Sequence, residues 1–399
     1  MDPPVEDRFP RSCGKVLAHG AGWVRMAPDT PETIPGNGQY FFLTRILPHS
    51  GHLRLKIEWP QTSATELPGF YYPGNENYAA VLDQVCFRSP DLGKWEAIHE
   101  VEGTTTGVNL VLPPEEAPVF ISVGIPYLPE SLERLLADME AAEVCRLEKI
   151  GTSRNGRPVH GLLFEPGEHS ECKGLFVLQG YQHHTEWAGL FALDSLARGL
   201  ADGRLDRGDF AWAIVPCLNV DSLYGGWKED RMHTHPGNGK CGNLNRDWGG
   251  FEYPETAAAG EWYTRLSEKW TVLHGLDIHM GWNAPDRSGG GLTVFKKGML
   301  PEEASLHEAA FTRHFFEQVP IEPFAWEVTE VERPNFAAWV WRRFGAIGQT
   351  MEVSRFLAYD REGQPQRTSQ AYYQGLGPAV ANCLMKFYNH AKVPVQPIR

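Results

Sequence analysis

The sequence predicts an α/β protein with two domains, a small β-sandwich followed by a larger layered α/β domain. A length of 399 residues allows about two domains. From Gly20 to about Pro126, short β-rich runs are separated by turns of Gly, Pro, Asn and Ser, a spacing typical of a sandwich. Beyond this part, strand-like and helix-like blocks alternate, as in a layered α/β domain. We therefore expect a β-sandwich domain over residues 1–128 and a second domain over residues 129–399.

Local patterns predict the elements of each domain. In the first domain we expect strands over Tyr40–Ile46, His52–Trp59, Gln84–Phe87, Gly107–Leu112 and Val119–Val123. A helix over Pro129–Cys145 opens the second domain, because its apolar residues recur at helical intervals and acids lie near its start. Further helices are expected over Trp187–Leu200, Pro254–Trp270, Pro301–Glu317 and Ser369–His390, and strands over Gly174–Leu178, Ala211–Cys217, Thr271–His279 and Ala346–Val353.

Composition and charge exclude several classes of protein. Apolar residues make up 42% of the chain and charged residues 22%, a globular balance. The 37 Lys and Arg against 50 Asp and Glu give a net charge of −13, which argues against nucleic acid or an anionic membrane as a partner. The seven cysteines are scattered and never form C-x-x-C, and the N-terminus lacks the features of a signal peptide. We expect a cytoplasmic protein.

A histidine and a glutamate three residues apart form the first candidate metal site. His183 and Glu186 lie in the segment G-Y-Q-H-H-T-E-W, after an expected strand and at the opening of an expected helix. Imidazole nitrogen and carboxylate oxygen are both ligands of Zn²⁺. Because the same spacing recurs at His99 and at His314, spacing alone does not identify a site. His314 lies on a charged helix and His99 among acids in the β-rich part, which favours His183.

Two more segments place polar side chains near the same sheet edge. His279 ends the apolar run V-L-H-G-L-D-I-H, where a strand delivers its last side chain to the carboxyl edge of the sheet, although for this residue taken alone a core or surface histidine is the better interpretation. Asn245 and Arg246, in G-N-L-N-R-D-W, offer an amide and a rigid guanidinium fork that can hold a carboxylate. An ordinary surface loop is the alternative for this pair.

Taken in order, these motifs resemble the zinc metallocarboxypeptidase family (M14-like). The resemblance also includes I-G-T-S-R-N-G-R-P-V-H at 150–160, P-C-L-N-V-D-S at 216–222 and T-M-E-V-S at 350–354, and it covers roughly residues 145–390. The β-rich first part, ending in V-G-I-P-Y-L-P-E-S-L-E-R-L-L, is similar to the sandwich domain of the cytosolic carboxypeptidase branch. The resemblance implies an N-terminal antiparallel β-sandwich followed by a mixed-sheet α/β/α catalytic domain.

The resemblance also implies a metal centre and a general base. His183, Glu186 and His279 would hold one catalytic zinc per chain, with water as its fourth ligand. Glu352, in the expected strand G-Q-T-M-E-V-S, matches the carboxylate that takes a proton from this water and returns it to the leaving amine. A buried glutamate paired with an arginine is the alternative for Glu352.

For substrate binding, the resemblance implies a clamp on the terminal carboxylate. Asn245 and Arg246 match this clamp, which explains exopeptidase action because an internal peptide bond offers no such anion. Arg231 is the candidate cation for the oxyanion of the tetrahedral intermediate, and a solvent-exposed structural role is nearly as good an interpretation. Three arginines lie in the right interval to line a specificity pocket but fit a solvated helix face better: Arg333, Arg342 and Arg343.

Three positions depart from the family pattern. Asn243 stands where the family usually has an aspartate that orients a zinc-bound histidine, and an amide does not raise the basicity of imidazole as a carboxylate does. No tyrosine occurs between His279 and Glu352, although the family commonly has a substrate-contacting tyrosine there. Thr185 replaces an arginine of the pancreatic-type members. We therefore expect an unusual substrate or closing loop.

Three functions follow from these observations. The first is a zinc metallocarboxypeptidase that hydrolyses the C-terminal peptide bond of peptides or protein tails. The second keeps the metal site but deacylates N-acyl amino acids, as the aspartoacylase-like relatives do. The third is a non-catalytic peptide-binding module, against which the presence of all three ligands and Glu352 argues. The sequence leaves the preferred C-terminal residue and the oligomeric state open.

Overall fold

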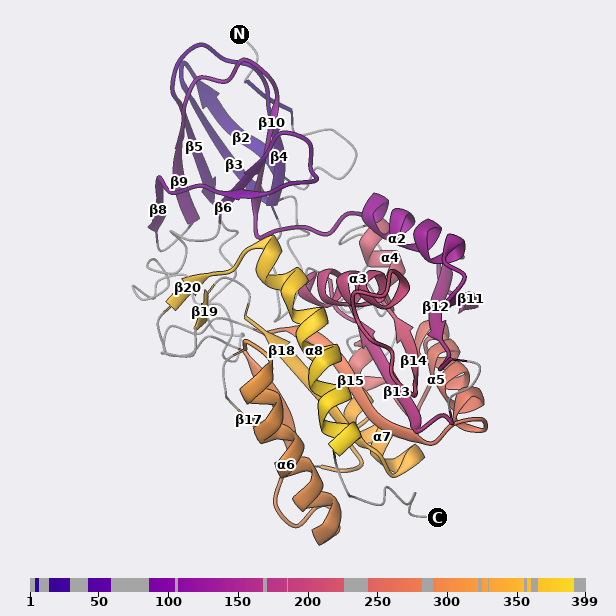
Figure 1. Ribbon diagram of the computed structural model, residues 1–399. Coiled ribbons are helices and arrows are strands. Elements are labelled where there is room, and N and C mark those ends of the chain that lie inside the picture. Colours follow the sequence, from indigo (N-terminus) through magenta and orange to yellow (C-terminus); the bar gives the residue numbers. More distant parts are fainter. Residues whose placement is uncertain are drawn as a thin grey trace.

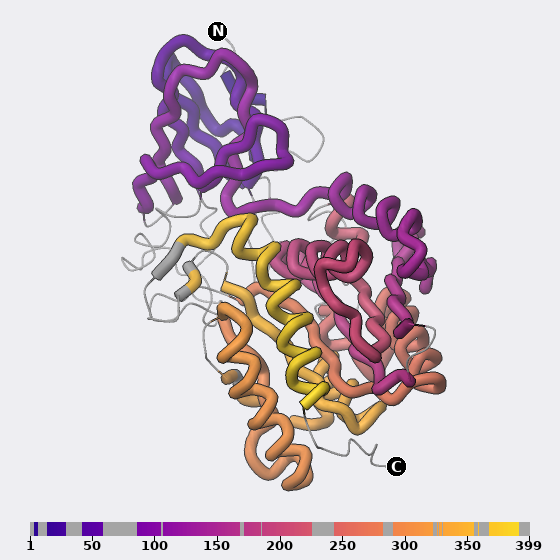
Figure 2. Tube along the Cα trace, viewed as in Figure 1, coloured from indigo at the N-terminus to yellow at the C-terminus, as the bar shows by residue number. Residues whose placement is uncertain are grey.

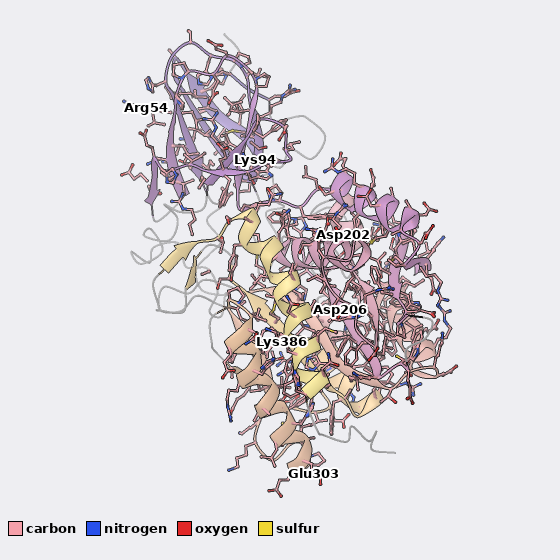
Figure 3. All side chains as sticks on the ribbon, viewed as in Figure 1. Arg54, Lys94, Asp202, Asp206, Glu303 and Lys386 are labelled. Carbon is pink, nitrogen blue, oxygen red and sulfur yellow. The ribbon has the colours of Figure 1, made fainter. Side chains whose placement is uncertain are left out.

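The computed structural model describes most of the chain (Figures 1 and 2). The described residues are 4–6, 14–28, 42–58, 86–104, 107–167, 171–184, 186–225, 243–281, 290–321, 325–328, 330–354, 357–359 and 365–390. The charged side chains of Arg54, Lys94 and Glu303 are exposed (Figure 3). Within these ranges, no helix has both the length and the apolar character needed to span a bilayer.

The N-terminal part consists of two five-stranded sheets that share an apolar core. One sheet has the order β1-β4-β10-β6-β7, with strands Val5–Glu6, Phe42–Ile46, Val119–Val123, Cys86–Ser89 and Glu96–Ala97. The other has the order β2-β3-β5-β9-β8, with strands Gly14–Gly20, Trp23–Pro28, Leu53–Glu58, Gly107–Leu112 and Val101–Thr104. Alternate residues of β5 are buried, as expected when only one face of a strand meets the core. The described pairings are antiparallel except for β3 with β5.

Helix α2, Pro129–Ala141, connects the sandwich with the second sheet. Proline at the first helical position fits its start, because the missing N–H would have no partner there. The helix buries Leu132, Leu135 and Met139 and is shorter than expected. Cys145 does not belong to it but begins strand β11, Cys145–Thr152, because the chain turns after Ala141.

The second part is built on an eight-stranded mixed sheet. Its order is β11-β12-β14-β13-β15-β18-β16-β17, the further strands being Pro158–Phe164 (β12), Phe210–Val215 (β14), Gly174–Gly180 (β13), Val272–Met280 (β15), Ile347–Val353 (β18), Gly291–Phe295 (β16) and Ala325–Val328 (β17). The four central strands, β14, β13, β15 and β18, are parallel. Every residue of β13, β14 and β15 is buried, as in parallel strands covered on both faces.

Helices cover both faces of this sheet, which confirms the α/β fold class and its mixed sheet. On one face lie α3 (Ala188–Ala201), α6 (Glu302–Gln318) and α8 (Gln370–His390), and on the other α5 (Pro254–Ser267) and α7 (Phe336–Phe344) (Figure 1). The shorter elements include α4 (Val220–Gly225), the 3₁₀ helix η2 (Leu244–Arg246), β19 (Leu357–Tyr359) and β20 (Pro365–Arg367). The sequence analysis did not predict β11, β12, β16, β17 or α7.

Candidate metal centre

The candidate site lies at the carboxyl edge of the parallel strands. β13 ends at Gly180, where the backbone turns sharply because Tyr181 has a positive φ of 56°. The loop after it carries His183 and Glu186 and leads directly into α3. β15 brings His279 to the same edge, because Gly180 pairs with the residue just before it, Ile278. Two neighbouring strands thus deliver the three expected ligands to one place.

The three side chains meet through atoms that can bind a metal. His183 Nδ1 lies 2.9 Å from Glu186 Oε1, and His279 Nδ1 lies 2.8 Å from Glu186 Oε2. The two Nδ1 atoms are 3.2 Å apart. Ligand atoms of all three residues fall within 4.8 Å of one another, and a search of the described residues finds no second cluster of this kind.

The chemistry of this cluster fits zinc. Two imidazole nitrogens and one carboxylate are the donor set of catalytic zinc sites that keep a position for water. Glu186 and His279 are buried, and a buried charge needs compensation by a partner of opposite charge or a metal. Burial acts against the ionised form, but His183 and His279 hold the pKa of Glu186 well below its usual range. The carboxylate is therefore ready to bind a cation.

The Nε2 atom of each imidazole, which faces away from the cluster, also has a polar partner. His183 Nε2 lies 3.0 Å from Asn243 Oδ1, so Asn243 stands where the resemblance places an orienting group. His279 Nε2 lies 2.6 Å from Asp277 Oδ2, and the pKa of His279 is raised well above its usual value by Asp277 and Glu186, against the effect of burial. Such outer contacts fix the ring orientation and leave Nδ1 facing the cluster.

The sequence analysis missed the orienting role of Asp277, although a signal was present. Residues two apart on a strand point to the same face, so Asp277 and His279 share one face of β15. Gln182 extends this network: its Nε2 donates to Asp277 Oδ2, and its Oε1 accepts from Trp248 Nε1 at 3.0 Å. Asn219 Nδ2 donates to the Gln182 carbonyl at 3.1 Å. The loop that carries His183 is therefore anchored by buried hydrogen bonds.

Two motifs of the resemblance, residues 150–160 and 216–222, have no role assigned by it. Hydrogen bonds join them to each other beside this loop. Asp221 is buried and accepts from Ser153 Oγ at 2.8 Å, from Asn155 N at 3.0 Å and from Arg157 Nη1 at 2.9 Å. A buried carboxylate is stable when hydrogen bonds and a cation satisfy it in this way. We infer that these motifs support the site and do not react.

Glu352 lies on β18, the strand next to the one that carries His279. Its strand β18 is parallel to β15, and Glu352 pairs in register with His279. Burial, together with Glu186 and Asp277, raises the pKa of Glu352 to about 7, while the two histidines act in the opposite direction. A carboxyl group that titrates near neutral pH is suited to accept and return a proton.

Asn245 and Arg246 lie on the short 3₁₀ helix Leu244–Arg246, which Asn243 caps by accepting from Asn245 N at 2.9 Å. Asn245 is buried, with Nδ2 3.3 Å from His279 Nε2 and Oδ1 accepting from Phe336 N at 3.2 Å. Its amide therefore contacts the ring of His279. Arg246 is exposed, and burial of part of its side chain together with the charge of Arg333 lowers its pKa to about 10, so it stays cationic at neutral pH.

The remaining candidate arginines have other positions. Arg231 lies outside the described residues, as does Thr185. Arg342 donates to the carbonyls of Val331, Arg333 and Trp248, so its guanidinium joins the segments around these residues. Arg343 donates to Thr264 Oγ1 at 3.4 Å.

Comparison with known proteins agrees with this geometry. Residues 132–279 match the zinc carboxypeptidase family (peptidase M14). This segment is similar to the zinc carboxypeptidase family over about a third of the chain. The match contains His183, Glu186, Arg246 and His279 and ends before Glu352.

One curated relative of the chain is the inactive metallocarboxypeptidase ecm14 of Schizosaccharomyces pombe. The two are 29% identical over 131 residues, which is 29% of this chain and 26% of the relative. The chain therefore matches about a quarter of the relative's length. The relative's name describes that protein as inactive.

Solved structures share the fold over nearly the whole chain. A metallo-carboxypeptidase from Burkholderia cenocepacia has a TM-score of 0.72 at 17% identity and covers 96% of this chain and 98% of its own. A metallo-carboxypeptidase from Pseudomonas aeruginosa, in complex with (2-guanidinoethylmercapto)succinic acid, has the same TM-score and identity and covers 96% and 99%. At this identity the likeness establishes the fold, including the N-terminal sandwich.

Proposed function

We propose that this protein is a zinc-dependent metallocarboxypeptidase that removes the C-terminal residue of peptides or protein tails. The observation that carries the proposal is the convergence of His183, Glu186 and His279, with Glu352 in register on the neighbouring strand. A non-catalytic peptide-binding module has no need of a carboxyl group with a pKa near 7 beside a metal cluster.

In this proposal His183, Glu186 and His279 hold the metal, and Glu352 carries the proton. When bound, zinc would act as a Lewis acid that lowers the pKa of water and polarises the scissile carbonyl. Glu352 accepts the proton released from water and donates it to the leaving amine. One carboxyl group can serve both transfers, because it accepts a proton when ionised and donates it when protonated. Asp277 and Asn243 keep the imidazoles in the orientation that exposes Nδ1 to the cluster.

We assign recognition of the terminal carboxylate to Arg246. Its guanidinium is exposed at the same edge as Glu352, whose charge is close enough to affect the pKa of Arg246. Asn245, the second member of the expected clamp, has both polar atoms engaged within the protein and would need to exchange a contact to reach substrate. Arg231 remains our candidate for the oxyanion. We keep the division into residues 1–128 and 129–399 as part of this proposal.

We also propose a cytoplasmic location and no nucleic-acid or membrane partner. The support is the net charge of −13 and the free thiols of the described cysteines, Cys86, Cys145, Cys172, Cys217 and Cys383.

The test is a peptide library read by mass spectrometry. Zinc-loaded wild-type protein should shorten peptides from the C-terminus, whereas Glu352→Gln should leave them intact. A matched N-acyl amino acid series distinguishes the deacylase alternative, because only that enzyme would release free amino acid from it and spare the peptides. Absence of cleavage of either class by a fully zinc-loaded wild type would contradict an enzymatic function.

A further inference from the structure

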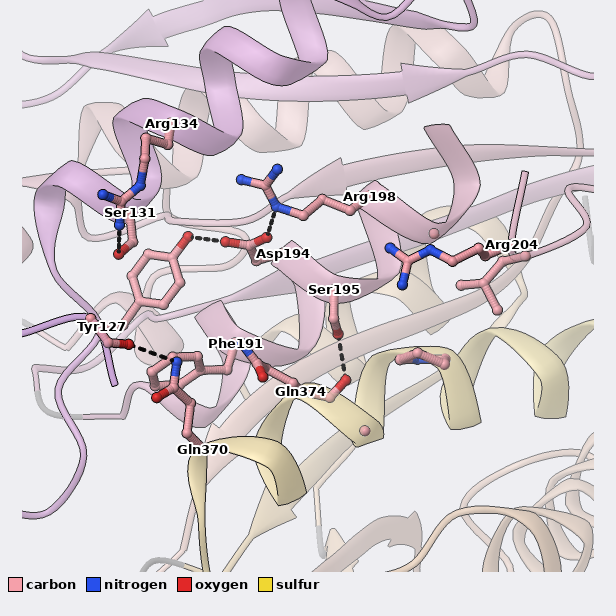
Figure 4. A pocket seen from close by; sticks show the side chains of 15 residues that line it. Tyr127, Ser131, Arg134, Phe191, Asp194, Ser195, Arg198, Arg204, Gln370 and Gln374 are labelled. Carbon is pink, nitrogen blue, oxygen red and sulfur yellow. Dashed lines mark hydrogen bonds and ion pairs between the residues drawn. The ribbon is translucent and has the colours of Figure 1, made fainter. Parts of the chain in front are cut away.

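A cavity lies along α3, between α2 and α8 (Figure 4). Its volume is about 620 Å³. The metal ligands, Glu352 and Arg246 do not line it, so it is distinct from the candidate metal centre. A cavity of this size falls within the range of small-molecule sites.

The wall of this cavity is rich in arginine in a chain that is acidic overall. Arg134 from α2, Arg198 from α3 and Arg204 from the turn after α3 line it, together with one acidic residue, Asp194. Asp138 and Asp202, outside the lining, pair with Arg198 and Arg204. Guanidinium groups that keep free donors in a concave site can bind an anion.

Both oxygens of Asp194 are already engaged by its neighbours. Its Oδ2 accepts from the Tyr127 hydroxyl at 2.5 Å, and its Oδ1 accepts from Arg198 Nε at 2.5 Å (Figure 4). Arg198 also forms an ion pair with Asp138, outside the cavity lining. The charge of Arg198 is therefore shared between two carboxylates, and Arg134 and Arg204 are the lining cations open to a ligand.

The arginines keep free N–H groups for a ligand. Arg134 Nη2 donates to Ser131 Oγ at 3.1 Å, and no carboxylate among the described residues lies within ion-pair distance of Arg134. Arg204 uses Nε to bind Asp202 at 2.8 Å, and both of these side chains are exposed. A guanidinium has five donors, so both arginines can bind a further carboxylate or phosphate.

The opposite wall is fixed in place by the packing of α8 on α3. Pro378 has no N–H for the carbonyl of Gln374 four residues earlier, and Ser195 Oγ donates to that carbonyl instead, at 2.6 Å. The two helices approach so closely that a Cβ at Gly377 would lie 2.0 Å from the Ala192 carbonyl oxygen. The cavity is therefore formed before any ligand binds.

We infer that this cavity binds a small organic anion that carries several carboxylate or phosphate groups. Arg134 and Arg204 bind the anionic groups through their free N–H donors, because guanidinium geometry matches both carboxylate and phosphate. The exposed amide of Gln374 adds a neutral donor on the α8 side. This inference is independent of the proposed peptidase activity.

Gly375 provides a sharp test because it lines the cavity and a Cβ there would meet nothing within 4 Å. Gly375→Glu adds a carboxylate and bulk to the cavity, while Gly375→Ala leaves it almost unchanged and suits a helix better than glycine. Arg134→Gln removes the charge of the arginine that has no acidic partner among the described residues. Arg265→Gln, on the exposed side of α5, is the matched control for loss of a surface arginine.

Binding is measured by calorimetry on the zinc-loaded full chain at constant ionic strength. The probes are tricarballylate, a tricarboxylate without the chelating hydroxyl of citrate, and glycerol phosphate. We expect binding by the wild type, Gly375→Ala and Arg265→Gln, at least about tenfold weaker binding by Arg134→Gln, and none by Gly375→Glu. The preferred probe shows whether the natural ligand carries carboxylate or phosphate.

Absence of heat with both probes at millimolar concentration would overturn the inference. Undiminished binding by Gly375→Glu would overturn it as well, because it would place the anion elsewhere, for example at the metal centre. If Arg134→Gln does not fold, the comparison of Gly375→Glu with Gly375→Ala decides alone.

Discussion

Asp277→Asn tests how the buried network controls the metal centre. Asp277 is fully buried, and its Oδ2 lies 2.6 Å from His279 Nε2 and also accepts from the amide of Gln182. An asparagine keeps the shape but loses the negative charge, and its own amide group then competes with that of Gln182 for an acceptor. His279 loses both basicity and a fixed ring orientation.

Changes of this kind in outer contacts weaken metal binding by about 10- to 100-fold, or roughly 1.4–2.7 kcal/mol. The assay is competition with a chromophoric zinc chelator at pH 7, with thermal unfolding measured in parallel. Asn243→Asp is the matched variant with the opposite expected sign, because it gives His183 the carboxylate that His279 already has. Unchanged zinc affinity in folded Asp277→Asn would refute the orienting role of Asp277.

Three further outcomes are expected. Glu352→Gln should retain zinc by elemental analysis and lose about 10²-fold or more in kcat, since an amide cannot accept the proton from water; near-normal kcat would move the general base elsewhere. Arg246→Ala should lose roughly one to two orders of magnitude in kcat/KM on a free-acid peptide and cleave the matched C-terminal amide equally slowly, whereas equal wild-type rates on acid and amide would exclude the clamp. Glu308 is buried on α6, and burial raises its pKa to about 7, against the N–H of Phe295. Because the pKa of Glu308 is higher in the folded state, the contribution of Glu308 to stability should fall by about 3 kcal/mol as pH rises from 4.5 to 7. Glu308→Gln should be the more stable protein in urea at pH 8 and lose this advantage near pH 4.5, unlike the exposed control Glu303→Gln; parallel pH profiles of wild type and Glu308→Gln would contradict this assignment.

The fold was predictable where burial is continuous. β13, β14 and β15 are buried along their full lengths, so each appears in the sequence as an apolar run with clear limits. The missed strands lie toward the edges of the sheet: β11 is only partly buried, and β16 and β17 follow β18 at the opposite side. Half-exposed strands keep polar residues on one face, which makes short ones difficult to distinguish from loops.

The ligands could be located from sequence because they follow strand ends, and strand ends converge. His183 and Glu186 come directly after β13, and His279 is the penultimate residue of β15. Their spacing carried little information, since His314 and Glu317 have the same spacing yet lie on or near the surface of α6, where the ring of His314 packs against Phe387. The position of His183 at a strand end distinguished this site from the other His-x-x-Glu segments.

Contacts that depend on distant pairing could not be found in this way, and α7 shows why they matter. This helix was not predicted, yet it packs on β15 and β18, where Gly275 and Gly348 leave no room for a side chain: a Cβ at Gly348 would lie 2.3 Å from the Ala337 carbonyl oxygen. Close packing fixes the first turn of α7, whose Phe336 N–H binds Asn245, 91 residues earlier in the chain. Asn245 in turn contacts His279. The two glycines therefore reach the site through backbone approach, because a side chain at Gly348 would displace α7 and with it the hydrogen bond from Phe336 to Asn245, the residue that contacts the imidazole.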